Sequence, residues 1–139
     1  MQKVFWVLVL FLGICIYGYA QGEASPLKEK EKIKINDRYA FQYEFAQKPK
    51  MGPAVLKITV FDAALGRTDN KTTGLTILGS YDMPSMRGHH ASGLQTIKTN
   101  KNKEYLFPVN FVMRGGWEIV LSFQDQDAEL YSGLILVKI

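Results

Sequence analysis

Methionine and histidine side chains gather in one short stretch of the chain, which reads Met-Pro-Ser-Met-Arg-Gly-His-His from Met83 to His90. A further methionine, Met113, stands before a Gly-Gly pair later in the chain. Thioether sulfur and imidazole nitrogen are side-chain donors suited to copper, and sulfur is especially suited to Cu(I). The sequence therefore predicts a copper site, Cu(I) favoured, with the candidate ligands Met83, Met86, His89, His90 and Met113.

The stretch has the residues that a tightly bent loop requires. Pro84 fixes φ in its first half, and Gly88 allows the positive φ with which a chain folds back. Adjacent side chains diverge, so we expect only one imidazole, His89 with His90 in reserve, to join the sulfurs. A second interpretation stays open, in which the methionines fill gaps at the end of the fold and the histidines are solvated.

Apolar residues that alternate with polar ones predict the strands that would position this loop. Tyr39, Phe41, Tyr43 and Phe45 give one aromatic face, and Trp117 begins a similar series. We predict an all-β fold, a single immunoglobulin-like β-sandwich of about seven antiparallel strands. The expected strands cover residues 39–45, 55–61, 75–81, 94–99, 104–112, 117–123 and 129–139. Antiparallel pairing of 94–99 with 104–112 would bring Met113 beside the Met/His loop.

The first twenty residues have the pattern of a secretory signal. Lys3 precedes an apolar run over 4–16, and Gly18-Tyr19-Ala20 offers small residues at a cleavage site. We divide the chain into a signal peptide at 1–20, a charged flexible tether at 21–32 and a β-sandwich domain at 33–139. Two alternatives remain: an uncleaved membrane anchor over residues 4–20, and a lipoprotein with Cys15 as the acceptor.

Composition excludes several classes of function. Cys15 is the only cysteine, so the domain itself has no thiol for redox or zinc-thiolate chemistry. The net charge of +4 comes from scattered lysines without an aromatic-basic motif, and we expect no nucleic-acid binding. No nucleophile elbow or phosphate-binding loop is present, so we expect no enzymatic activity.

These motifs resemble those of the YtkA-like/FixH family of exported or membrane-anchored β-sandwich domains. That family shows Met-Pro-x-Met followed by Gly-His, then a strand ending in Phe-x-Met-x-Gly-x-Trp. Here Met-Pro-Ser-Met occupies 83–86, Gly-His occupies 88–89, and Phe-Val-Met-Arg-Gly-Gly-Trp occupies 111–117. Arg87 departs from the family pattern, where many members run Met-Gly-His directly, and it would re-aim His89.

The resemblance implies copper handling, and in some members copper-dependent oxidase assembly. We therefore expect an extracytoplasmic, periplasmic copper-binding module that acts in copper delivery or buffering. The alternative is a non-metal docking domain for a membrane protein partner. The two hypotheses differ in whether the protein binds Cu(I) without a partner.

Overall fold

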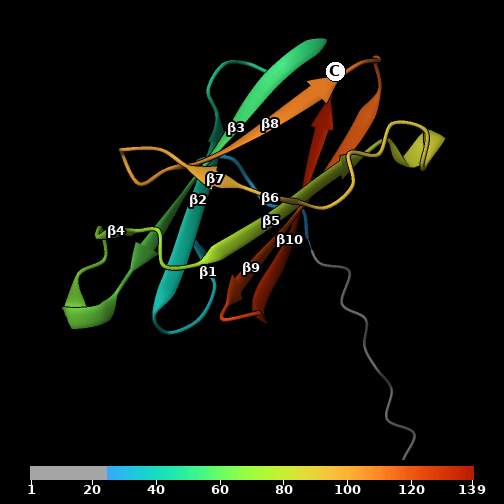
Figure 1. The fold of residues 1–139 in the computed structure, drawn as a ribbon. Coiled ribbons are helices and arrows are strands. Elements are labelled where there is room, and N and C mark those ends of the chain that lie inside the picture. Colours follow the sequence, from blue (N-terminus) through green and yellow to red (C-terminus); the bar gives the residue numbers. More distant parts are fainter. Residues whose placement is uncertain (1–24) are drawn as a thin grey trace, which may run out of the picture.

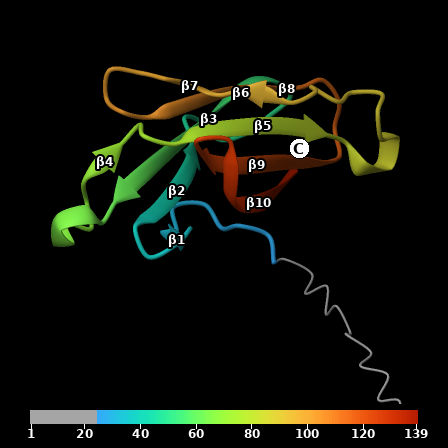
Figure 2. The ribbon, with the colours of Figure 1, turned by 60° about the horizontal axis from the view of Figure 1, so that its bottom comes forward.

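Two antiparallel β-sheets pack face to face in the computed structural model, which describes residues 25–139 (Figures 1 and 2). The predicted signal or anchor at 1–20, including Cys15, lies outside the described residues. None of the helices in the described part is long and apolar enough to cross a membrane. They are two single 3₁₀ turns, η1 (Ala64–Gly66) and η2 (Pro84–Met86).

The first sheet is built around β3, the long strand that pairs with β2 on one side and β8 on the other. Its order is β1-β2-β3-β8-β7, and β4 also pairs with β3. The strands are β1 (Ile33–Lys34), β2 (Tyr39–Phe45), β3 (Gly52–Asp62), β4 (Lys71–Thr72), β7 (Lys98–Thr99) and β8 (Tyr105–Phe111).

The second sheet has the order β10-β9-β5-β6, with every pair antiparallel. Its strands are β5 (Thr76–Asp82), β6 (Gln95–Thr96), β9 (Gly116–Asp125) and β10 (Ala128–Lys138). The order β2-β3-β8-β7 against β10-β9-β5-β6 corresponds to the A-B-E-D and G-F-C-C′ order of immunoglobulin domains. The predicted all-β, immunoglobulin-like sandwich is confirmed.

The core lies between the sheets and follows the period-two pattern of the sequence. Leu56, Ile58 and Val60 of β3 are fully buried, as are Phe41 of β2 and Phe123 of β9. The rings of Phe41 and Phe123 lie 4.3 Å apart between centroids, so the two sheets are in direct aromatic contact. With no cysteine in the described residues, burial of such side chains, each worth about 1.5–3 kcal/mol, holds the sandwich together.

The predicted strand over 94–99 is wrong as a single element. β6 pairs with β5, whereas β7 pairs with β8, so the chain changes sheet at Ile97. Ile97 is buried and donates its N–H to the carbonyl oxygen of Ile77 at 2.8 Å. A Cβ on Gly79 would lie 2.9 Å from Ile97 Cδ1, so this glycine makes the room for the crossing.

The predicted flexible tether at 21–32 is attached to the sandwich at Leu27. Its N–H donates to the carbonyl oxygen of Leu134 on β10, and its own carbonyl accepts from the Tyr43 hydroxyl on β2, both at 2.8 Å. A Cβ on Gly133 would lie 2.6 Å from Leu27 Cδ1, so the leucine occupies space that this glycine leaves. Leu27 therefore joins the two sheets on one side of the sandwich.

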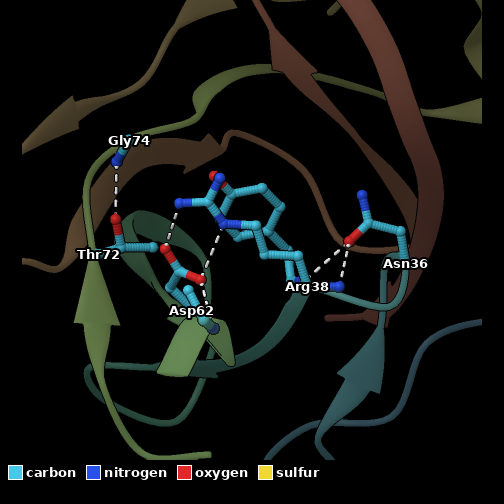
Figure 3. A network of polar contacts seen from close by, with 7 residues as sticks. Asn36, Arg38, Asp62, Thr72 and Gly74 are labelled. Atoms are coloured by element: carbon cyan, nitrogen blue, oxygen red, sulfur yellow. Dashed lines mark hydrogen bonds and ion pairs between the residues drawn. The ribbon is translucent and has the colours of Figure 1, made fainter. Parts of the chain in front are cut away.

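A polar network ties β2 and β3 together at the end of the sandwich away from the Met/His loop (Figure 3). Arg38 donates through Nε and Nη2 to the two carboxylate oxygens of Asp62, at 3.0 and 2.8 Å. Asp62 Oδ1 also accepts the N–H of Ala64 at 2.8 Å. The hydrogen bonds from the Arg38 guanidinium have the larger effect and the Ala64 N–H the smaller one, and together they hold the pKa of the Asp62 carboxyl below its usual range.

We expect Asp62→Asn to weaken the pH dependence of stability in acid. Because the folded pKa is lowered, the carboxylate stabilises the fold above about pH 4, and this contribution is lost as the pH falls through the folded pKa. Urea unfolding at neutral and acidic pH should show a smaller acid-induced loss in the variant. Asp69→Asn, at an exposed position in the 63–75 loop, is the control and should keep the wild-type loss. Equal losses in all three proteins would contradict the prediction.

Candidate functional site

Three loops meet at one end of the sandwich, which we call the methionine pole: residues 46–51, 83–94 and 112–115. The pairing register brings them together, because Gly52 is opposite Phe111 and Asp82 is opposite Glu118. Figures 1 and 2 both show the 83–94 loop, in yellow, beside the turn between β8 and β9. Met113 lies in that turn, so its predicted position at the same end as the Met/His loop is confirmed.

Met83 continues the inward-facing series of β5 and is almost fully buried, at 2% exposure. Its N–H donates to Asp82 Oδ1 at 2.8 Å. Its terminal methyl reaches under the 112–115 turn, where a Cβ on Gly115 would lie 2.9 Å from Met83 Cε. Met83 thus fills a core position as well as being a candidate ligand, and its sulfur is available only to a metal held beneath the loop.

Met86 ends the 3₁₀ turn η2 and is partly buried against the core. The turn is fixed by backbone bonds, because Met86 N–H donates to the Met83 carbonyl at 3.0 Å and His89 N–H to the Met86 carbonyl at 3.1 Å. Gly88 has the expected positive φ, 84°, and bends the chain back. His89 is exposed just after this bend.

His90, rather than His89, packs toward the core. Its ring centroid lies 6.3 Å from that of Trp117, which is 1% exposed. The Trp117 indole Nε1–H donates to the Met113 carbonyl oxygen at 3.0 Å. Trp117 is therefore in contact with both His90 and the Met113 turn, and the expected inward packing of its ring is confirmed.

Arg87 attaches the loop to β9 and β5. Its guanidinium lies 3.2 Å from Glu118 Oε2 and 3.9 Å from Asp82 Oδ2. Asp82 also accepts the Gly88 N–H at 3.3 Å. The Arg87–Glu118 ion pair is exposed on its arginine side, and exposed ion pairs add little to stability. Its main effect is therefore to orient the loop.

Met51 also lies at this pole, and the sequence analysis did not select it. It precedes Gly52, whose partner Phe111 is two residues before Met113. Every methionine and histidine of residues 25–139 consequently lies at the methionine pole: Met51, Met83, Met86, His89, His90 and Met113. The β3–β8 register was the signal that could have found Met51.

Within the described chain, no group of three or more His, Cys, Asp or Glu side chains is placed to hold a metal ion. A metal at the methionine pole would depend on methionine sulfur, the donor that fits Cu(I). No protein-family model and no curated protein matches the sequence. The interpretation of the site therefore depends on its geometry.

Proposed function

We propose that this protein is an exported copper-binding module, without catalytic activity of its own, that delivers or buffers Cu(I). One observation carries the proposal: antiparallel pairing gathers all the methionines and histidines of residues 25–139 at one end of the sandwich. The resemblance of residues 83–89 and 111–117 to the YtkA-like/FixH motifs supports the same interpretation.

The proposed ligands come from both loops that contact Trp117. Met86 and Met83 come from the loop after β5, and Met113 comes from the turn before β9. His90 is the better imidazole candidate, because it packs against Trp117 whereas His89 is exposed. Both histidines stay in the candidate set.

The burial of these groups suits transfer of the metal. Met113 is 39% exposed, so an incoming or outgoing ion could approach its side chain from solvent. Met83 is buried and Trp117 closes the inner side, so water is excluded from below. An accessible outer ligand with protected inner ligands would allow Cu(I) to pass from partner to partner without release into solution.

Replacing Met83 and Met86 together by leucine tests the proposal. Leucine keeps apolar bulk and removes both sulfurs, so Cu(I) affinity should fall at least about tenfold, or roughly 1.4 kcal/mol, in anaerobic competition with a Cu(I) chelator. Zn(II) should bind more weakly than Cu(I) to the wild type. Met51→Leu is the matched control. It should keep the wild-type affinity, because Met51 lies in the 46–51 loop, which contributes none of the proposed ligands.

One outcome would reject this function, and another would reject the assigned ligands. If the wild type binds no Cu(I), the alternative of a non-metal docking domain for a membrane protein is favoured. If the wild type binds Cu(I) and the double variant binds it equally well, Met83 and Met86 are not ligands.

A further inference from the structure

The loops of the methionine pole carry exposed apolar side chains, and their charged residues are all lysine or arginine. In the described residues, seven large apolar side chains are exposed, and the pole has four of them: Met51, Leu94, Val112 and Met113. The other three lie on the strands β3, β9 and β10. Four of these seven side chains thus lie in the loops at one end of the sandwich.

The charges of the same loops have one sign. Residues 46–51, 83–94 and 112–115 contain lysine and arginine but neither aspartate nor glutamate. Among the described residues, the cations Lys48, Lys50, Arg114 and Lys138 form no ion pair. At the opposite end, the loops at 63–75 and 100–104 carry charges of both signs.

One of the exposed apolar side chains, Met51, meets three of the free cations in a hollow of this pole. Lys50, Met51, Arg114 and Lys138 line it together with Pro49 and Ile139. The turn that presents Arg114 is held by reciprocal backbone bonds between Gly115 and Ile139, at 3.1 and 3.0 Å. The cations are therefore held around the apolar side chains by the ends of β3, β8 and β10.

We propose that the methionine pole docks on the surface of a bilayer that contains anionic phospholipid. Lysine and arginine are attracted to anionic headgroups, and short apolar side chains between them enter the interface. Lysine is depleted at protein–protein interfaces, whereas this pole presents Lys48, Lys50 and Lys138. The composition thus favours a lipid surface over an acidic protein partner.

The docking surface shares only Met113 with the proposed copper site, since its cations and the exposed Met51, Leu94 and Val112 are not proposed ligands. A docked domain would hold the 83–94 loop next to the bilayer. Metal exchange with a membrane-embedded partner would then occur over a short distance.

A local fluorescent probe tests the proposal in the full chain, whose N-terminal apolar run alone can bind any bilayer. An environment-sensitive nitrobenzoxadiazole label is attached to Val112→Cys in a Cys15→Ser background. Its emission should shift to the blue on vesicles of equal parts phosphatidylcholine and phosphatidylglycerol, and stay unshifted on phosphatidylcholine alone. A label at Lys101→Cys, at the opposite end, should not shift on either vesicle.

Charge reversal separates this docking from anchoring by the N-terminus. Lys50→Glu with Arg114→Glu should abolish the shift of the probe at 112, and high salt should do the same. The matched reversal Lys101→Glu with Lys103→Glu should leave it intact. No shift on the anionic vesicles, or an equal shift in the Lys50→Glu, Arg114→Glu protein, would overturn the proposal. A shift with soluble polyglutamate, but not with vesicles, would assign the pole to an acidic protein instead.

Discussion

Trp117→Ala should lower the free energy of unfolding by about 3–5 kcal/mol, the largest loss expected from a single substitution in this domain. The side chain is 1% exposed and packs against the rings of Phe111 and Tyr81, at centroid distances of 5.5 and 6.1 Å. Its removal leaves a cavity between the two sheets and takes away the donor to Met113. Urea unfolding followed by far-ultraviolet circular dichroism would measure the loss.

Two further variants show where the loss comes from. Trp117→Phe keeps an aromatic ring and removes the indole N–H, so it should cost clearly less than Trp117→Ala. Leu136→Ala, on the exposed face of β10, should change stability by no more than about 0.5 kcal/mol. If Trp117→Ala cost less than about 1 kcal/mol, the indole would not be the core residue that its burial indicates.

Trp117→Ala should also loosen the methionine pole more than the rest of the sandwich. The indole touches both the His90 ring and the Met113 turn, so the two loops lose their common contact. Amide hydrogen exchange within 83–94 and 112–115 should accelerate more than exchange in β2 and β3. A uniform acceleration across the domain would indicate that Trp117 acts on global stability alone.

The sequence predicts the sandwich well because its signal is local. Strands such as β2 and β9 alternate buried residues with more accessible ones, and a period of two identifies them without knowledge of their partners. The change of sheet at Ile97 is different, because the same short apolar pattern is compatible with either sheet. Leu27 is a similar case, since its docking depends on Tyr43 and Leu134, which are distant in the sequence.

For the candidate site, sequence proximity explains what could be predicted. Met83, Met86 and the histidines lie in one bent loop, and the antiparallel pairing of β5 with β9 brings Met113 to them. Met51 was missed because it lies in a proline-containing turn and comes to the pole only through the β3–β8 register. The burial of Met83 was readable in the inward series that includes Ile77 and Gly79 on β5.

Gly115→Ala should destabilise the domain by about 1–3 kcal/mol, whereas Gly116→Ala should change its stability by no more than about 0.5 kcal/mol. Gly115 has a φ of 138°, a conformation that residues with a Cβ rarely adopt. The added Cβ would also lie 2.9 Å from Met83 Cε, while at Gly116 it would have no atom within 4 Å. The neighbouring glycines thus provide a matched pair, to be compared by urea unfolding.

The turn has little freedom to relax around a new Cβ, because Gly115 exchanges two backbone hydrogen bonds with Ile139 at the end of β10. The two sources of strain can be separated in a double-mutant cycle with Met83→Leu, which removes the terminal methyl of Met83. If the contact contributes, Gly115→Ala will cost less in the Met83→Leu background, and the residual cost will measure the backbone strain. An equal cost in both backgrounds would assign the effect to φ alone, and equal stability of the Gly115→Ala and Gly116→Ala proteins would contradict this geometry of the turn.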